Sequence, residues 1–204
     1  MRVVLASASP ARLETLRRAG LDPEVQVSGV DESEVTEPDP AVLASELAAR
    51  KARAVAARIG DAFVVGCDSV LELGGRVHGK PGTAEVARER WRAMRGRSGV
   101  LHTGHCVVDT GTGHELVRAA RTVVHFAPVT DEEIDAYVAT GEPLQVAGAF
   151  TIDGLGGAFV DRVEGDPHTV VGISLPLLRR MFAELGVRWT DLWAPARAEA
   201  GRRD

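Results

Sequence analysis

The sequence predicts an α/β fold with a mixed, twisted β-sheet flanked by helices, and three features of the pattern support this. Segments with the apolar spacing of amphipathic helices alternate irregularly with short apolar runs typical of strands. Glycine-containing turns at 74–75 and 110–113 join neighbouring runs into antiparallel hairpins. A continuous apolar run at 62–67 is typical of a strand buried on both faces. Hairpins among helices and buried strands favour a mixed sheet over a regular doubly wound one.

The first third of the chain supplies both amphipathic helices and buried strands. Ser9 can cap a helix that begins at Pro10, the position where proline fits best, and that ends near Gly20. The elements expected here are a strand at 2–6, the helix from residue 10, an alternating strand at 24–30, an acidic loop at 31–40, a helix at 41–59 and the strand at 62–67.

The rest of the chain adds the two hairpins and three more helices. Thr130 and Glu133 have the spacing of a capping box, which predicts a helix that ends near Gly141. The glycine-rich segment 146–165 is interpreted as strand-like, and His168 as a loop residue. The remaining elements expected are a hairpin at 70–81, a helix at 84–94, a second hairpin at 100–117, a strand at 121–129 and a closing helix at 174–186.

Composition indicates a globular protein with one continuous domain at 1–190 and a loosely ordered tail at 191–204. The 204 residues are 45% hydrophobic, which is enough for a substantial core. A net charge of −5 argues against a protein that coats nucleic acid or an anionic membrane, although a local basic pocket can still hold a small phosphorylated ligand. Two cysteines without a CxxC pair are expected to be buried thiols in a reducing compartment. We find no signal peptide or spanning segment and expect a cytoplasmic protein.

Arg12 is an unusual residue for the first turn of a helix. The N-terminus of a helix carries the positive pole of its dipole, so a cation there is mildly unfavourable. Free backbone N–H groups make the same position a ready anion site, and Ser7 and Ser9 add hydroxyl donors. Arg12 is therefore either a phosphate-binding residue or a solvated surface arginine, and this stretch alone does not decide between them.

Two carboxylates and two lysines are further candidates for chemistry. Asp68 follows a buried apolar strand, at the end of a sheet where ligands bind, and it can hold a cation, accept a proton or merely cap a turn. Lys80, in the sequence HGKPG, can contact a phosphate or can simply leave a hairpin. Lys51 lies in an amphipathic helix and Glu32 in an acidic loop, where solvated side chains are equally expected.

Other polar motifs do not predict a site. His102 and His105 are three apart on a strand, so they point to opposite faces and cannot share a metal. The sequence DGLGG lacks the spacing of a dinucleotide-binding loop. The candidate cations are Arg12, Lys51 and Lys80, and with a helix N-terminus they suit a polyphosphate. Glu32 and Asp68 suit a divalent metal that accompanies a polyphosphate.

Six segments, in this order along the chain, resemble the Maf family of nucleoside triphosphate pyrophosphatases, also called septum-formation proteins. The segments are LASASPARLETL, VDE, LAARKARAVA, VVGCDSVLELGGRVHGKP, GEPLQVAGAFTIDG and VVGISLPLL, between Leu5 and about Leu185. The resemblance implies a mixed α/β fold of the Maf/ITPase type, with the active-site cleft at the edge of the sheet. It also implies hydrolysis of a nucleoside triphosphate to the monophosphate and pyrophosphate, with Mg²⁺ or Mn²⁺ as cofactor.

The resemblance also implies roles for individual residues. Asp68 matches the proton acceptor of the family. Ser7 lies in the same opening motif, and Ser9, Arg12, Lys51 and Lys80 match phosphate-binding positions. Glu32 and Asp68 would hold the metal. The family further suggests a homodimer and a link to cell division.

Three positions depart from the family pattern. Ala11, Ser69 and Asp153 stand where subgroups of the family differ according to the base that they accept, and this combination matches neither the pyrimidine subgroup nor the 7-methyl-GTP subgroup. An ionised Asp153 can accept hydrogen bonds but cannot donate them, which predicts a relaxed pocket that prefers bases presenting N–H donors.

The alternative function is a nucleotide-binding regulator of septum formation that acts through a protein partner without significant turnover. A pure sensor would not need a positioned base such as Asp68. Pyrophosphate release from a panel of nucleoside triphosphates distinguishes the two classes.

Overall fold

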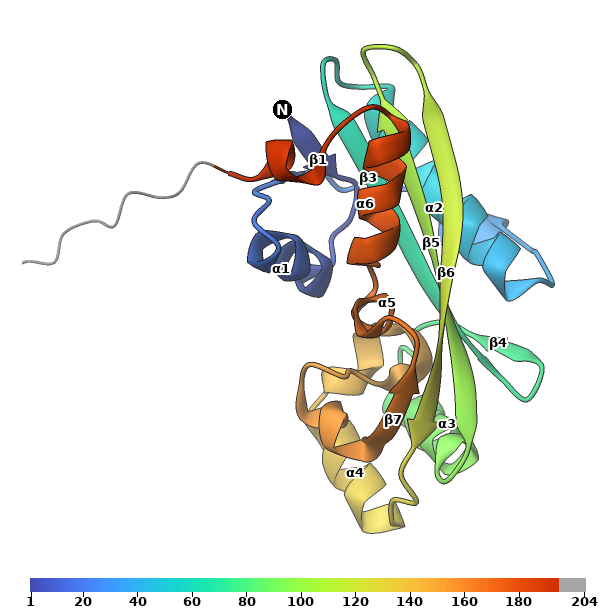
Figure 1. Ribbon diagram of the computed structural model, residues 1–204. Helices are drawn as coiled ribbons and strands as arrows, with labels where there is room; N and C mark the ends of the chain where they lie inside the picture. The colour runs from blue at the N-terminus through green and yellow to red at the C-terminus, as the bar shows by residue number, and fades with distance from the viewer. Residues whose placement is uncertain (195–204) are drawn as a thin grey trace, which may run out of the picture.

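The computed structural model describes residues 1–194, and its centre is a seven-stranded mixed sheet (Figure 1). The strands lie in the order β2-β1-β3-β5-β6-β7, with β4 paired to part of β3. β1 pairs in parallel with β2 and β3, and every other pair is antiparallel. The expected mixed α/β sheet is therefore confirmed. The strands are β1 (Val3–Leu5), β2 (Glu24–Val25), β3 (Phe63–Leu73), β4 (Arg76–His78), β5 (Ser98–Asp109), β6 (Glu115–Phe126) and β7 (Val160–Glu164).

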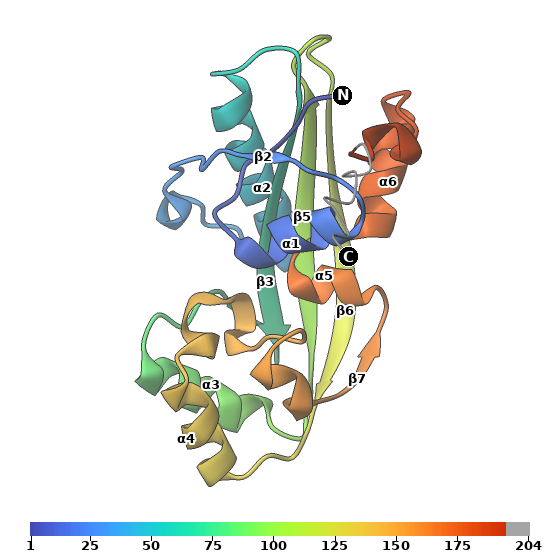
Figure 2. The same cartoon turned by 90° about the vertical axis from the view of Figure 1, so that its left-hand side faces the viewer.

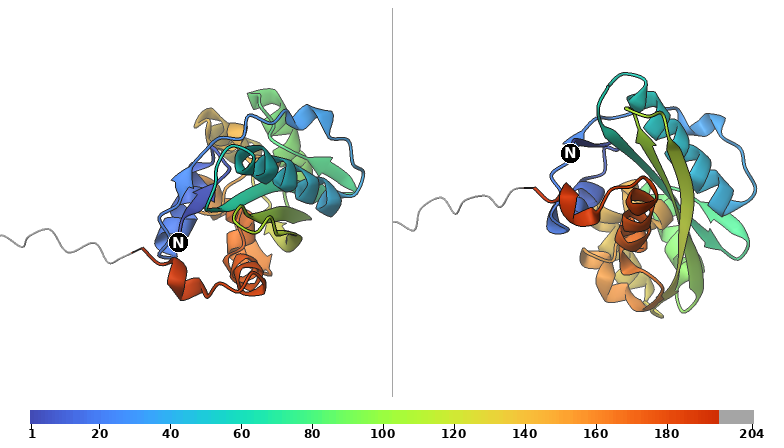
Figure 3. Two further views of the ribbon diagram at one scale, coloured as in Figure 1. Left: turned by 90° about the horizontal axis from the view of Figure 1, so that it is seen from above. Right: turned by 45° about the horizontal axis from the view of Figure 1, so that its top comes forward.

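Helices cover both faces of the sheet. α2 lies against one face, while α1, α5 and α6 lie on the other (Figure 3). The helices are α1 (Pro10–Arg18), α2 (Pro40–Ala56), α3 (Ala84–Met94), α4 (Asp131–Ala139), α5 (Pro167–Val171) and α6 (Leu175–Glu184). Short 3-10 helices occur at Glu32–Glu34, Glu142–Gln145, Ala147–Ala149, Leu155–Phe159 and Trp189–Leu192.

Two glycines let α2 approach the sheet closely. A Cβ atom at Gly66 on β3 would overlap the carbonyl oxygen of Ala48, and one at Gly104 on β5 would overlap that of Ala44. Only glycine fits where backbone meets backbone in this way. The close approach brings the middle of α2, including Lys51, against the neighbouring part of β3.

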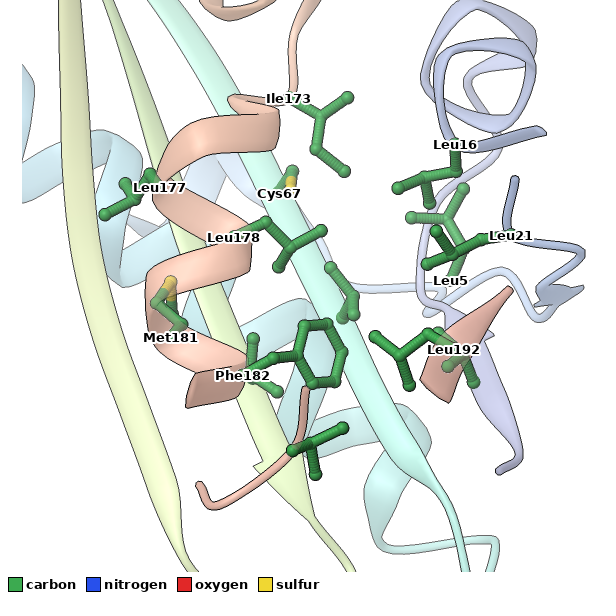
Figure 4. Close-up of a cluster of buried hydrophobic side chains, with 14 residues drawn as sticks. Leu5, Leu16, Leu21, Cys67, Ile173, Leu177, Leu178, Met181, Phe182 and Leu192 are labelled. Carbon is green, nitrogen blue, oxygen red and sulfur yellow. The ribbon is translucent and has the colours of Figure 1, made fainter. Parts of the chain in front are cut away.

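The opposite face of the sheet carries the main apolar core. Leu178 and Phe182 of α6 pack with Leu16 of α1, Leu5 of β1 and Cys67 of β3 (Figure 4). All five side chains are fully buried. Burial of a large apolar side chain contributes about 1.5–3 kcal/mol, so this cluster fixes α1 and α6 on the sheet.

A second core lies at the far end of the three long strands, where α3 and α4 pack (Figure 2). Trp91 of α3 makes edge-to-face contacts with Tyr137, Phe126 and Phe159, at ring-centroid distances of 5.5–5.8 Å. Most of the few aromatic residues of the chain are thus concentrated in one half of the molecule, beside the segment that follows α4.

Most of the expected elements are present, and the differences have local causes. The strand expected at 24–30 is only two residues long, because its partner β1 ends at Leu5 and the chain turns into α1. The strand expected at 121–129 is the second half of β6, whose pairing with β5 continues through residues 118–121, between two arginines.

The glycine-rich segment 146–165 is not strand-like over its length. Only Val160–Glu164 forms a strand, since positive φ angles at Gly148 and Ala149 bend the backbone away from an extended conformation and a 3-10 helix follows at Leu155–Phe159. His168 lies in α5 rather than in a loop, because Asp166 caps that short helix.

The tail expected from residue 191 begins inside the 3-10 helix Trp189–Leu192. Leu192 is buried in the α6 core, so this part of the chain packs on the domain. Residues 195–204, the rest of the expected tail, lie outside the described residues. Among residues 1–194, none of the helices combines the length and the hydropathy needed to cross a bilayer.

Candidate active site

A cleft opens at the edge of β3 that the other strands leave free. β1 pairs with residues 63–65 and β4 with residues 71–73, so neither covers the stretch between them. The cleft has a volume of about 670 Å³ and reaches from the N-terminus of α1 to the segment 145–153. Every residue that the sequence singled out lines it: Ser7, Ser9, Ala11, Arg12, Glu32, Lys51, Asp68, Ser69, Lys80 and Asp153. A smaller cavity of about 230 Å³ near Arg2 and Asp109 contains none of them.

Lys51 lies between two carboxylates. Its Nζ is 2.5 Å from Oδ1 of Asp68 and 2.6 Å from Oε1 of Glu32. The side chains of Lys51 and Asp68 are each only 10% exposed, whereas that of Glu32 is 44% exposed. Lys51 is therefore not a solvated lysine of an amphipathic helix, because the fold uses it to neutralise a buried carboxylate.

The charge balance in the cleft keeps Glu32 ionised. Partial burial opposes its ionisation, but the hydrogen bond and charge of Lys51, helped by Lys80 and Arg12, outweigh burial and lower the pKa of the Glu32 carboxyl. Lys80 and Arg12 thus lie close enough to Glu32 to act on it electrostatically. The cations and the acids surround one volume, as a polyphosphate–metal site requires.

Arg12 connects three segments of the chain. Its Nε donates to the carbonyl oxygen of Gly172 at 2.8 Å, and its two terminal nitrogens donate to the hydroxyls of Ser7 and Ser69, both at 3.2 Å. A guanidinium has five N–H donors, so two remain for a ligand. Arg12 is consequently both a structural clamp and a hydrogen-bond donor available to an anion. The alternative of a solvated surface arginine is wrong.

The hydroxyl of Ser69 belongs to a chain of hydrogen bonds with one direction. Thr103 donates to the carbonyl oxygen of Thr169 at 3.0 Å, so its own hydrogen is committed. The contact of 2.9 Å between the Ser69 and Thr103 hydroxyls therefore has Ser69 as donor. Because its single hydrogen goes to Thr103, the Ser69 oxygen can only accept from a ligand, with the lone pair that Arg12 does not use.

The two serines before α1 shape its N-terminus. Ser9 caps the helix, since its hydroxyl accepts from the backbone N–H of Arg12 at 3.4 Å. Ser7 accepts from the backbone N–H of Ser9 and from Arg12, both at 3.2 Å, and its own hydrogen stays available. The loop is thus held in the conformation that points the N-terminus of α1 at the cleft.

Ala11 and Asp153 line the cleft from α1 and from the loop that precedes Leu155–Phe159. Asp153 is exposed, and Val146 and Phe150 line the cleft from the same segment. Ala11 presents only a methyl group. The part of the cleft beside the segment 146–153 is therefore mainly apolar, with Asp153 as its charged group.

Sequence reasoning missed Thr103, Thr169 and Gly172. Thr103 matters because β5 places it opposite Ser69, a pairing that no local pattern reveals. Gly172 ends α5 with a φ of +113°, which presents its carbonyl to Arg12. The one local signal for Gly172 is that a glycine after two valines indicates a turn in the backbone. The expectation for the histidines is confirmed: His102 contacts Glu72, and His105 contacts Ser174 on the other face.

The donor set fits a divalent cation of the magnesium type. Within the described residues, no group of three or more His, Cys, Asp or Glu side chains could enclose a metal ion. Glu32 and Asp68 supply two oxygen ligands around Lys51. Mg²⁺ is commonly held by one or two carboxylates together with substrate phosphates and water, so two carboxylates suffice.

Comparison with known proteins identifies the family. Residues 2–185 match the model of Maf-like proteins. The chain belongs to the Maf-like family. Among Maf-like relatives, it is similar to a protein of Streptomyces coelicolor named nucleoside triphosphate pyrophosphatase, with 60% identity over 96% of both chains. It is also similar to a protein of the same name from Salinispora tropica, with 59% identity over 95% of this chain and 88% of that one.

The Maf-like fold has a wider structural likeness. The Ham1 protein of Staphylococcus aureus superimposes with a TM-score of 0.53 over 91% of this chain and 100% of that one, at 13% identity. At this identity the likeness shows the fold alone, which this chain shares with that Ham1 protein.

Proposed function

We propose that this protein hydrolyses nucleoside triphosphates to nucleoside monophosphate and pyrophosphate. The observation that carries the proposal is the Glu32–Lys51–Asp68 cluster beside the Arg12 clamp, in one cleft at the sheet edge. Full-length relatives at 53–60% identity that bear the name nucleoside triphosphate pyrophosphatase support it further. A reaction of this kind depends mainly on positioning and on neutralising charge, which this cluster provides.

Asp68 is the group that we assign as proton acceptor. Lys51 contacts its Oδ1, and in the described part of the chain Oδ2 accepts no hydrogen bond, so one oxygen remains free to take a proton from water. Lys51 holds the carboxylate in place. A positioned base of this type typically contributes 10²–10⁴-fold to the rate.

The cations bind the phosphates. Arg12 has two N–H groups left after its three protein contacts, and the N-terminus of α1 adds backbone donors. Lys80 contributes a point charge from the loop after β4. Together with Ser7 and Ser9 these groups would orient the triphosphate and stabilise the leaving pyrophosphate.

A divalent cation is part of the proposal. Glu32 and Asp68 would hold it, and when bound it would neutralise the charge of the phosphate oxygens. Lys51 contacts both carboxylates and so holds the two proposed ligands close together.

The residues proposed to contact the base predict a modest preference among nucleobases. Ser69 and Asp153 both offer acceptors to a ligand, and Ala11 leaves space instead of a large side chain. Guanine and cytosine present an exocyclic amine, whereas uracil and thymine present a single ring N–H between two acceptors. Guanine and cytosine should therefore be preferred, on the order of 10- to 100-fold at most.

The test is pyrophosphate release from GTP, CTP, UTP, dTTP and 7-methyl-GTP with Mg²⁺. Asp68→Asn should lose about 10²–10⁴-fold in kcat. Asp135→Asn, which changes an exposed carboxylate paired with Arg88 on α3, is the matched control and should keep wild-type activity. Tight nucleotide binding by the wild type without pyrophosphate release would instead favour the regulatory alternative. The homodimer, the cytoplasmic location and the role in septum formation stay predictions.

A further inference from the structure

Glu142 is a carboxylate outside the cleft that the proposed chemistry does not use. It begins the 3-10 helix Glu142–Gln145 and does not line the cavity. Its Oε1 accepts from the hydroxyls of Tyr137 at 2.9 Å and Thr151 at 2.5 Å, and from the backbone N–H of Gly156 at 3.0 Å. Its Oε2 accepts from the backbone N–H of Leu155 at 3.0 Å. Four neutral donors therefore surround one anion.

Three of the four donors come from a single short loop. Thr151, Leu155 and Gly156 enclose the carboxylate, and Asp153 lies between them in the sequence and lines the cleft. The loop thus wraps around the Glu142 side chain on one side and presents Asp153 to the cleft on the other. The position of Asp153 is set by the anion that holds both ends of its loop.

The backbone of this loop is adapted to the carboxylate. A Cβ atom at Gly154 would lie 2.7 Å from Oε2 of Glu142, and one at Gly156 would overlap the hydroxyl of Tyr137. Gly154 has a φ of −130°, so its backbone conformation is open to any residue and only the contact with Glu142 excludes a side chain.

The anion is anchored to the aromatic core of α3 and α4. Tyr137 donates to Glu142 and also accepts from the backbone N–H of Thr151 at 3.3 Å. Trp91 donates to the carbonyl oxygen of Ala149 at 2.8 Å, just before the loop. Partial burial opposes ionisation of Glu142, but hydrogen bonds from Thr151, Gly156, Leu155 and Tyr137 outweigh it and lower its pKa.

We propose that Glu142 is a positioning residue for base selectivity, which acts by fixing Asp153 in the cleft. The inference rests on the proposed pyrophosphatase function and deepens it. Glu142 touches neither the triphosphate site nor the cleft, so its effect must pass through the loop. Because a displacement of about 1 Å can cost on the order of 100-fold in an enzyme, a loosened loop should weaken discrimination between bases.

Glu142→Gln tests this with a change of one atom. The amide oxygen can replace Oε1, but the amide nitrogen would face the N–H of Leu155, donor against donor. We expect the ratio of kcat/KM for GTP to that for UTP to fall by at least about tenfold, the smallest loss expected for one hydrogen bond to a charged group. The kcat for UTP should change less than twofold, because the phosphate end is untouched.

Glu133→Gln is the matched control. Glu133 is also a carboxylate that accepts from a backbone N–H, that of Thr130, but it caps the start of α4 and does not contact the loop. The Glu133→Gln variant should have a lower melting temperature but the same GTP-to-UTP ratio of kcat/KM as the wild type. If Glu133→Gln shifts the ratio as much as Glu142→Gln does, the effect is general loosening and the inference is wrong.

A double-mutant cycle separates positioning from stability. Asp153→Ala removes the side chain through which Glu142 is proposed to act, so adding Glu142→Gln to it should leave the GTP-to-UTP ratio unchanged. A further fall in the double variant would overturn the inference. Gly154→Ala, whose methyl group pushes the loop off Oε2, should reproduce the Glu142→Gln ratio and serves if Glu142→Gln does not fold.

Failure of the inference is distinguishable from failure of the proposed function. A wild-type protein that releases no pyrophosphate from any nucleotide overturns the function itself. A wild type that hydrolyses all five nucleotides with equal kcat/KM, or an unchanged ratio in both Glu142→Gln and Gly154→Ala, overturns only the positioning role.

Discussion

His105 makes the stability of this fold depend on pH in a defined direction. Its ring is fully buried between β5 and the start of α6. The backbone N–H of Ser174 donates to Nε2 at 2.7 Å, so Nε2 must be unprotonated, and Nδ1 carries the hydrogen that it donates to the carbonyl oxygen of Thr103 at 3.1 Å. Burial, with the charge of Arg12, lowers the pKa of His105 to about 4.

The magnitude follows from the difference between the folded and unfolded states. The unfolded chain binds the proton with a pKa near 6.5, so acid stabilises the unfolded state first. The stabilising effect of a neutral His105 is therefore present above pH 6.5 and is lost as pH falls from 6.5 to about 4. The full loss is about 3 kcal/mol in the free energy of unfolding, and between pH 7.5 and 5.5 it is about 1 kcal/mol.

Urea denaturation at pH 7.5, 6.5 and 5.5 measures this loss. The wild type should lose about 1 kcal/mol more than His105→Asn over that range, whatever the absolute stability of the variant. His114→Asn, in the exposed turn between β5 and β6, is the control and should follow the wild type. Equal losses in wild type and His105→Asn, or an NMR titration of the His105 ring near pH 6.5, would refute the reasoning.

Three further predictions concern the cleft. Lys51→Met should abolish turnover and lower the free energy of unfolding by about 3–5 kcal/mol, and adding Asp68→Asn should restore part of this stability, because the unpaired buried charge is then gone. Urea denaturation of both variants measures the two effects, and a double variant no more stable than Lys51→Met would contradict the prediction. Arg12→Ala should lower stability by about 2 kcal/mol, seen as a fall of roughly 5 °C in Tm without nucleotide, since three hydrogen bonds are lost; an unchanged Tm would mean that the clamp does not stabilise the fold. EDTA should stop pyrophosphate release and added Mg²⁺ should restore it, whereas full activity in EDTA would exclude a required divalent ion.

Local patterns determined most of the elements, whereas the resemblance to the Maf family supplied the members of the cleft. Ser9 and Pro10 specify the start of α1, and Thr130 with Glu133 the start of α4, because capping depends on neighbours within one turn. Asp68 was expected where a strand ends, and this was wrong, because β3 continues to Leu73. Asp68 instead reaches the cleft from the middle of β3, where neither β1 nor β4 pairs with that edge. The segments that contain Arg12, Lys51 and Asp68 indicated one phosphate site, and the structure brings all three residues to one cleft.

The boundaries of irregular segments depended on partners that lie elsewhere in the chain. Alternation at 24–30 predicts a strand, yet β2 stops where its partner β1 stops. The segment 146–159 has the composition of a strand, but it folds around the side chains of Trp91 and Glu142 instead. A strand needs a neighbour to accept its hydrogen bonds, and the sequence of one segment does not reveal whether that neighbour is present.

The sequence, through its resemblance to a known family, determined which residues surround the cleft, whereas the tertiary structure alone decided what each of them does there. Arg12 looked like either a free cation or a surface residue, and only its contact with Gly172, 160 positions away, makes it a clamp. Ser69 became an acceptor because the sheet register places Thr103 opposite it. The physical reason is that a hydrogen bond has a direction and a partner, and both are set by segments far apart in the sequence that meet only in the folded chain.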